Sequence, residues 1–333
     1  MAGLVAAARA RELGAEPVVY EKGTRAGGSM LLSSGFAWRY RSLETFQEQC
    51  PGGDPVLQRL IVDRFDDDLD WLESLGVELL TRETGNPLTV GARFDPRQLV
   101  DVLGREVRLG ETTDVPRILA TGGFPVRLAR EQGLLLRANR WSEGDGLDLA
   151  RGRGAAAAGD LGEFYGRAMA AVGEIREDDF VGLAQLYGRF ATVTSEDGEH
   201  RFHGEPSWSE TDLVQQIARW PGGRAWYTVE AASLEQRVRE RTVREMIEAA
   251  REAGAPVREE GGRISVLVRA AVTQTLGGLR VDEQARVLDE SGRPVDGLYA
   301  AGVDAGGIST GGWSSGLATA LVLGRVAGES ALS

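Results

Sequence analysis

Four glycine-rich clusters are the feature that most constrains how this chain can fold. They read "GTRAGGSMLLSSG" at 23–35, "ATGGF" at 120–124, "TLGGL" at 275–279 and "AGVDAGGISTGGWSSG" at 301–316. Each cluster lies where an expected strand meets a turn or a helix, which is where α/β proteins place the loops that hold ligands. The clusters therefore predict an α/β fold built around a bound ligand.

The first residues predict half of a nucleotide-binding βαβ unit. Small residues follow Gly3 and predict a helix over 3–14 that stops at Gly14, and "PVVYEKG" predicts a strand that carries Glu21 near its end. Gly3 suits the third glycine of G-x-G-x-x-G, where the helix packs closely on a strand. Glu21, about 20 residues further on, is placed to accept hydrogen bonds from a ribose hydroxyl. We expect roughly ten apolar residues ending in G-x-G to precede Met1 in the intact protein.

The rest of the chain predicts further elements and a three-part organisation. We expect a helix or helix pair over 54–80 capped by Asp54, a helix over 233–254 capped by Ser233, a hairpin around "DESGRP", and a helix over 315–332. The strands in 117–124 and 297–304 look like two exits from one sheet. Aromatic and charged residues are enriched between about 160 and 270. This pattern predicts a nucleotide-binding domain at 1–160 and 271–333, interrupted by an inserted second domain at 161–270.

Composition excludes several classes of protein. The 333-residue chain has a net charge of -12 and one lysine, Lys22, which disfavours nucleic acid as a partner. One cysteine, Cys50, and two histidines, His200 and His203, leave no CxxC or histidine-rich metal site, so we expect no metal. No apolar run reaches the length of a membrane span and no leader is evident, so we expect a cytoplasmic protein without a membrane span.

The later clusters strengthen the dinucleotide interpretation. Asp304 follows a strand, and the helix after Ser315 directs its free N–H groups at a ligand, where they would stabilise negative charge on a reduced isoalloxazine ring. An NAD(P)-binding oxidoreductase, the competing interpretation, would not need this second glycine-rich closure far along the chain. FAD is therefore the expected cofactor.

With these motifs the chain resembles the fumarate reductase and succinate dehydrogenase flavoprotein superfamily, which includes ketosteroid dehydrogenases. The resemblance covers essentially the whole chain. It implies a Rossmann-like FAD-binding domain with a central parallel sheet, here without its first strand, interrupted by an α+β capping domain, with the substrate between cap and flavin. It also implies FAD contacts at Gly3, Glu21, Lys22, Gly27, Gly28, Ser29, Ser33, Gly35, Ala120, Thr121, Gly122, Asp304, Ser315, Gly316 and Leu317.

Three departures from the family argue against fumarate or succinate as the substrate. Fumarate reductases have a histidine where "VTQTLGG" has Gln274, an arginine in the last loop where "GGISTGG" has none, and a cap arginine where "PSWSETD" has none. Two carboxylate ligands and a proton donor are thus missing. We expect an FAD-dependent dehydrogenase or reductase that acts on another small or medium organic molecule, with an electron donor or acceptor left open.

Candidate catalytic residues come mainly from the expected cap. They are Tyr165 and Arg167 in "EFYGRAM" and Tyr187 in "AQLYGRF", with Gln274 beside the flavin. A tyrosine acts as a base at neutral pH only with a cation close by, which Arg167 would supply. For each tyrosine, a structural role in a core or interface is the alternative. Cys50 is expected to be a bystander, and a non-catalytic or cofactor-impaired relic of the same fold is the alternative for the whole chain.

Overall fold

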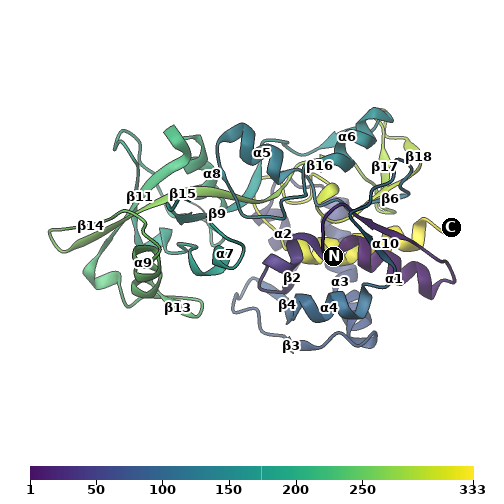
Figure 1. Ribbon diagram of the computed structural model, residues 1–333, viewed down its shortest axis with the longest axis horizontal. Helices are drawn as coiled ribbons and strands as arrows, with labels where there is room; N and C mark the ends of the chain where they lie inside the picture. Colours follow the sequence, from purple (N-terminus) through teal and green to yellow (C-terminus); the bar gives the residue numbers. More distant parts are fainter. Residues whose placement is uncertain (174) are drawn as a thin grey trace. The chain divides into compact units, whose positions relative to one another are not determined.

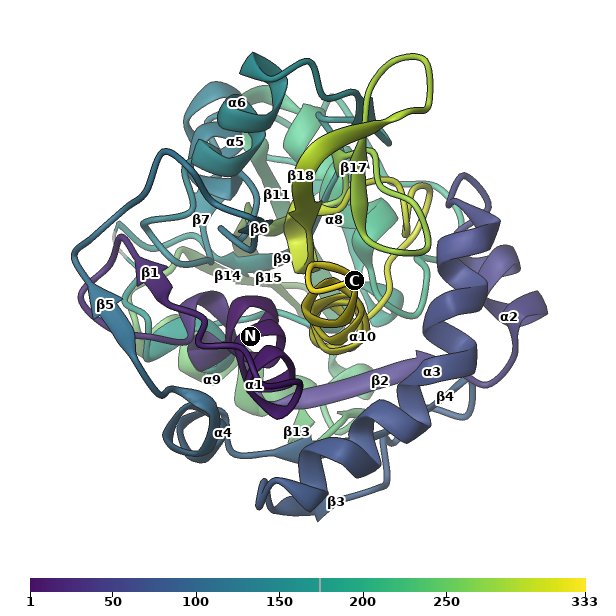
Figure 2. The same cartoon turned by 90° about the vertical axis from the view of Figure 1, so that its right-hand side faces the viewer.

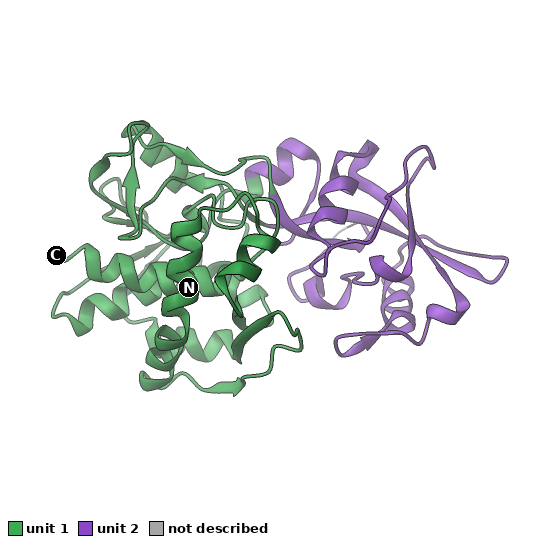
Figure 3. Ribbon diagram, turned by 180° about the vertical axis from the view of Figure 1, so that it is seen from behind, with its two compact units in different colours: residues 1–126, 139–163, 274–333 green, residues 127–138, 164–273 purple. Residues whose placement is uncertain are grey.

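The computed structural model describes residues 1–173 and 175–333, which divide into two compact units (Figure 3). Unit 1 comprises residues 1–126, 139–163 and 274–333, and unit 2 comprises residues 127–138 and 164–273. The chain therefore leaves unit 1 twice. The assignment of these parts to FAD binding and to a cap stays a prediction, as does a strand before Met1.

Unit 1 contains two parallel strand pairs, which lie in separate sheets. β1 (Val19–Glu21) pairs with β5 (Val107–Leu109), and β6 (Ile118–Leu119) pairs with β18 (Pro294–Ala300). The pairing of β6 with β18 confirms that the strands expected in 117–124 and 297–304, each followed by a glycine turn, belong to the same sheet. The remaining strands of this unit are β2 (Phe36–Tyr40), β3 (Leu79–Thr81), β4 (Thr89–Phe94), β8 (Ala157–Ala158), β16 (Gly278–Leu279) and β17 (Arg286–Leu288).

The core of unit 1 is built on the contact between its first and last helices. α1 (Ala2–Glu12) runs along α10 (Gly316–Ser330), as Figure 2 shows. A Cβ added at Gly324 would lie 2.8 Å from the backbone oxygen of Ala2, and one at Gly328 would lie 2.6 Å from that of Ala6. Two glycines one turn apart therefore let the helix backbones touch. The other helices are α2 (Leu43–Gln49), α3 (Pro55–Ser74), α4 (Pro96–Leu103), α6 (Asp145–Gly152), η1 (Gly28–Leu32) and η5 (Gly302–Asp304), and α5 (Pro125–Gln132) begins at the end of residues 1–126 and continues into unit 2.

Unit 2 is α+β, with a largely antiparallel sheet centred on one long strand, β15 (Arg263–Thr275) (Figure 1). The strand order is β10-β11-β15-β14, and β7 and β9 also pair with β15. These strands are β7 (Leu135–Leu136), β9 (Phe164–Ala170), β10 (Thr192–Ser195), β11 (Arg224–Glu230) and β14 (Val257–Glu260). Around them lie α7 (Asp179–Gly182), α8 (Thr211–Arg219), α9 (Val243–Glu252), η2 (Gly188–Phe190), η3 (Pro221–Gly223), η4 (Ala231–Ser233), and a small hairpin of β12 (Arg237–Val238) and β13 (Arg241–Thr242).

Most expected elements are confirmed. Asp54 caps α3 through its side chain, and α3 is one helix that ends just before Gly76, whose φ is +100°. Gly14, with φ +87°, ends the first helix, and the "DESGRP" segment forms the turn of the β17–β18 hairpin.

The helix expected over 233–254 with Ser233 as its cap is wrong. α9 begins at Val243, because Thr242 and Glu245 form a capping box in which each side chain bonds the other residue's backbone N–H. Residues 237–242 instead form the β12–β13 hairpin, and Arg239 in its turn has φ +57°, which no helix accommodates.

Candidate cofactor and substrate site

The end of β1 presents a carboxylate suited to a ribose. Glu21 is half-buried, and its Oε1 accepts a 2.7 Å hydrogen bond from the backbone N–H of Gly23. Its other oxygen accepts no hydrogen bond from a described residue. Lys22 forms ion pairs with two acids, and its Nζ lies 2.6 Å from Glu143 and 2.9 Å from Asp145.

Gly3 lies where a helix crosses a strand end. A Cβ at Gly3 would lie 3.4 Å from Cβ of Ala120, the residue directly after β6. A side chain here would touch this strand end at the short limit of ordinary van der Waals contact, so Gly3 lies where α1 packs on the strand, as expected of the third fingerprint glycine. The first N–H groups of α1 have no partner within the helix and can bind an anion.

The 23–35 cluster forms a tight loop around η1. Gly27 and Gly28 have φ of +107° and +55°, in the region that glycine adopts freely. Two serine hydroxyls stabilise the loop: Ser29 Oγ accepts from the N–H of Asn139 at 2.9 Å, and Ser33 Oγ accepts from the N–H of Gly35 at 3.1 Å. Ser29 and Ser33, which the resemblance assigns to FAD contacts, therefore also stabilise the loop itself.

A buried carboxylate organises the second glycine turn. Asp304 is 2% exposed and accepts hydrogen bonds from the Thr121 backbone, from Thr121 Oγ1 at 2.8 Å, and from the N–H groups of Gly122 and Gly123. Burial raises the pKa of Asp304, and these hydrogen bonds oppose the rise. In this structure Asp304 thus fixes the 121–123 turn, and its expected contact with FAD stays a prediction.

The start of α10 brings the predicted flavin-side residues together. Ser315 Oγ accepts from the N–H of Ala318 and caps the helix, and the next residues, Gly316 and Leu317, are half-buried. A Cβ at Gly316 would lie 2.2 Å from Oε1 of Gln274, so the amide of Gln274 rests against the helix start. Sequence reasoning did not single out the neighbouring Thr275, whose buried hydroxyl has no partner among the described residues and lies beside Gly123.

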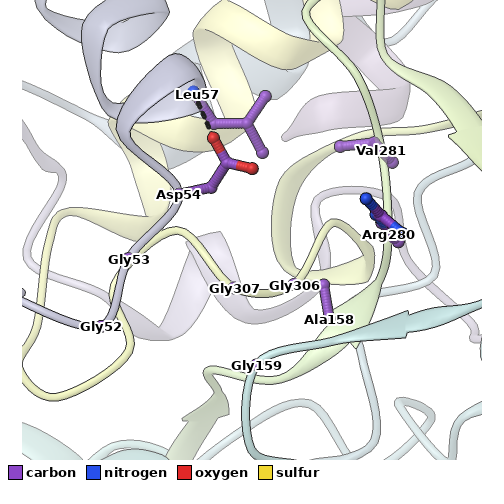
Figure 4. A pocket seen from close by; sticks show the side chains of 10 residues that line it. All are labelled: Gly52, Gly53, Asp54, Leu57, Ala158, Gly159, Arg280, Val281, Gly306 and Gly307. Atoms are coloured by element: carbon purple, nitrogen blue, oxygen red, sulfur yellow. Dashed lines mark hydrogen bonds between the residues drawn. The ribbon is translucent and has the colours of Figure 1, made fainter. Parts of the chain in front are cut away.

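Unit 1 also contains a cavity of about 250 Å³ near the start of α3 (Figure 4). Glycines dominate its lining, and Asp54 and Arg280 are its charged members. Asp54 is occupied with the cap of α3, where its Oδ1 accepts from the N–H groups of Val56 and Leu57. None of the residues expected to contact FAD lines this cavity.

Together these features define a nucleotide-binding α/β protein with an inserted second unit. The sequence matches the family described as "FAD binding domain" over residues 1–107 and 104–316. The chain belongs to this family, and FAD is its cofactor. The expected superfamily and fold class are confirmed.

The similar proteins agree with this assignment. The chain is 48% identical to the fumarate reductase of Schizosaccharomyces pombe over 61 residues, which are 18% of this chain and 12% of that protein's length. The 3-ketosteroid-Δ4-(5α)-dehydrogenase of Rhodococcus jostii RHA1, solved with 4-androstene-3,17-dione, superposes with a TM-score of 0.71 at 19% identity, over 100% of this chain and 95% of that one. A flavocytochrome c3 fumarate reductase in an open conformation gives 0.69 at 20% identity, over 99% and 76%. At these identities the structural likeness shows the fold alone.

The residues present in unit 1 fit FAD. Glu21 offers a free carboxylate oxygen to a ribose, Gly3 presents backbone without a side chain, and the capped start of α10 supplies oriented N–H groups. The orphaned hydroxyl of Thr275 is a further polar group that a bound molecule would satisfy.

The candidate catalytic residues of unit 2 include one close pair. The Arg167 guanidinium lies 5.0 Å from the ring centre of Tyr165, and both side chains are buried, at 5% and 7% exposure. Arg167 also donates a hydrogen bond to the backbone oxygen of Ser209. Arg167 therefore lies over the ring of Tyr165, and the catalytic role of Tyr165 stays a prediction.

Tyr187 lies in a different setting. It is fully buried, its ring packs edge-on against Tyr227 at 5.6 Å, and among the described residues neither hydroxyl has a partner. Burial, and then the charge of Glu210, raise the pKa of Tyr187 above its usual value, which disfavours a base role at neutral pH. Sequence reasoning missed Glu210, whose burial no local pattern signals.

Other candidates have structural surroundings. Cys50 is buried, and burial raises its pKa to about 12, so the thiolate needed for covalent attachment is disfavoured. His200 stacks on Trp220 at 6.3 Å. Within 1–173 and 175–333, no group of histidine, cysteine, aspartate or glutamate could hold a metal ion, and no helix has the length and apolarity to cross a membrane.

Proposed function

We propose that this chain is the catalytic core of an FAD-dependent dehydrogenase or reductase that acts on a small or medium organic substrate other than fumarate or succinate. FAD, when bound, supplies the centre that accepts or donates the hydride. The observation that carries the proposal is the convergence in unit 1 of Glu21, Gly3, the Asp304-bound turn and the start of α10, which together match what FAD requires.

The chain's own residues would divide the remaining work. Glu21 would hold the ribose, and the N–H groups at the start of α10 would stabilise negative charge near Gln274. Tyr165, with Arg167 over its ring, would move the proton that accompanies hydride transfer. Tyr187, with its raised pKa, is the weaker candidate for that role.

The test is anaerobic reduction of the bound flavin, followed by its visible absorbance, with a panel of organic reductants and, in the reverse direction, unsaturated acceptors. We expect one class of compound to change the absorbance, and a Tyr165→Phe variant to react at least ten-fold more slowly. Tyr20→Phe, an exposed tyrosine of β1, is the control and should react at the wild-type rate. A protein that binds FAD and reacts with no compound would contradict the proposal and support a non-catalytic relic.

A further inference from the structure

Three arginines of unit 2, Arg137, Arg167 and Arg239, lie close enough for their charges to act on one another. β7 and β9 both pair with β15, and Arg137 directly follows β7 while Arg167 lies on β9. Arg137 is tied to β15 as well, because its Nη1 donates to Thr273 Oγ1 at 3.2 Å. The sheet therefore brings these two guanidiniums to the same end of β15.

The stretch 180–184 brings the third arginine to the same place. Nε of Arg137 donates to the backbone oxygen of Phe180, and Arg241 donates to the backbone oxygens of Val181, Gly182 and Ala184. Arg241 anchors the β12–β13 hairpin, so the turn that carries Arg239 is fixed to the segment that also holds Arg137. Backbone hydrogen bonds from Ala170 and Gln185 join this stretch to β9.

Two of these arginines, Arg137 and Arg239, have no acidic hydrogen-bond partner among the described residues. Arg137 has only neutral partners, and Arg239 makes no hydrogen bond or ion pair with a described residue. The acids that act on Arg239 are Glu240, its exposed neighbour in the turn, and the buried Glu210.

The pKa values of Arg137 and Arg239 are consistent with several cations that lie close together. Burial, and then the charges of Arg167 and Arg239, lower the pKa of Arg137 to about 10, which leaves it charged at neutral pH. Arg239 is accessible to solvent, yet surrounding protein desolvates it and Arg167 repels it, so its pKa is lowered too. Both observations describe cations that a bound anion would stabilise.

The backbone of Arg239 has a conformation that favours glycine. Its φ of +57° lies in the left-handed region that glycine adopts without penalty and arginine rarely adopts. Glycine adopts this φ without strain, so the guanidinium at position 239 can be removed without a steric cost.

We propose that Arg137, Arg167 and Arg239, beside Tyr165, form a subsite in unit 2 for an oxyanion group, a carboxylate or a phosphate, of the organic substrate. Guanidinium groups suit both anions because their planar donors match paired oxygens. The inference rests on the proposed function for the role of the bound molecule, whereas the subsite lies entirely within unit 2. The arginines of this subsite are at other positions than the histidine and the two arginines of fumarate reductases that this chain lacks.

The experiment is isothermal titration calorimetry of the full-length, FAD-loaded protein with inorganic phosphate, malonate and dimethyl malonate at constant ionic strength. We expect phosphate or malonate to bind and the uncharged ester not to bind. Binding of phosphate alone indicates a phosphorylated substrate, and binding of malonate alone a carboxylate. Binding of neither anion, or of the ester as tightly as malonate, would overturn the subsite.

Variants separate recognition from folding. Arg239→Gly removes the guanidinium and suits the left-handed turn, so we expect an unchanged or higher melting temperature with at least ten-fold weaker anion binding. Arg137→Gln should weaken binding similarly, whereas Arg244→Gln, an exposed arginine paired with Glu235, is the control and should bind as wild type. Wild-type affinity in Arg239→Gly would overturn the assignment.

Flavin absorbance of the same samples distinguishes this inference from the proposed function. Anion binding by a full-length protein that cannot be loaded with FAD would contradict only the oxidoreductase proposal. Flavin retention without anion binding would contradict only the subsite.

Discussion

Asp304 and Thr121 lie 183 residues apart in the chain and are joined by a 2.8 Å hydrogen bond from the Thr121 hydroxyl to Oδ1 of Asp304. The same carboxylate accepts from the backbone N–H groups of residues 121–123. One buried acid therefore holds the turn after β6 against the segment after β18, and two of the four glycine clusters form a single structure.

Asp304→Asn should loosen this turn and weaken FAD binding. An amide keeps one acceptor oxygen and turns an NH₂ group toward backbone donors, which leaves buried groups unsatisfied. We expect the free energy of unfolding to fall by about 1–3 kcal/mol and the Kd for FAD to rise. Urea denaturation and flavin titration measure the two effects. Asp296→Asn, at an exposed aspartate, is the control and should match wild type within about 0.5 kcal/mol.

Gly328→Ala should destabilise the protein even though alanine favours helices. The added Cβ would lie 2.6 Å from the backbone oxygen of Ala6 and push α1 from α10. Overpacking of this kind costs about 1–3 kcal/mol and outweighs a gain in helix propensity of about 1 kcal/mol. Gly152→Ala, at the end of α6 with open space around it, should be neutral or stabilising. Equal melting temperatures for the two variants would argue against the close helix contact.

Thr242→Ala tests the start of α9. Loss of the Thr242 hydroxyl should lower the free energy of unfolding by about 0.5–2 kcal/mol, because the N–H of Glu245 loses its side-chain acceptor. Ser233→Ala is the matched comparison, since the Ser233 side chain caps no helix in this structure. A larger loss of stability in Ser233→Ala than in Thr242→Ala, measured by chemical denaturation, would support the longer helix expected from the sequence.

Glu210 should make stability fall as pH rises through the window from about 4.5 to about 6. Burial raises the pKa of its carboxyl from 4.5 to about 6, although Arg167 and the N–H of Gly188 oppose the rise. The folded state therefore holds the proton more tightly than the unfolded state, and this contribution is lost on deprotonation. A shift of this size corresponds to about 2 kcal/mol.

The measurement for Glu210 is urea denaturation of wild type and Glu210→Gln at several pH values. Glutamine keeps the acceptor for Gly188 and has no proton to lose, so the stability difference between the two proteins should change across this window. Glu205→Gln, at an exposed glutamate, should follow wild type. A constant difference between wild type and Glu210→Gln would mean that Glu210 is not desolvated.

Much of unit 1 could be predicted from the sequence because its signals are local. Asp54 before an amphipathic run, Gly14 after a helix and Ser315 before an apolar helix each act within a few residues of their position. The glycine clusters are also local signals, because each one indicates a close approach of the backbone to another group, whatever that group is.

Unit 2 was harder to predict because its decisive interactions join distant segments. The hairpin before α9 is held by Arg241 on backbone oxygens of residues 181–184, so tertiary contacts override a strongly helical sequence. Arg137 and Arg239 are 102 positions apart in the sequence. Stretch 180–184 brings them together, because Arg137 and Arg241, which anchors the hairpin of Arg239, both donate to its backbone oxygens. No spacing rule in the sequence reveals this arrangement. Burial of Glu210 likewise depends on the packed sheet and not on its neighbours in sequence.

The most direct test of the account is FAD binding by the full-length protein, measured by visible absorbance and by quenching of flavin fluorescence. We expect one FAD per chain and a Kd at least ten-fold higher in Glu21→Ala, because a ribose hydroxyl would lose its charged acceptor. Glu16→Ala, which lies between α1 and β1, is the control and should bind as wild type. Absence of flavin binding, or equal affinity in wild type and Glu21→Ala, would contradict the site described for unit 1.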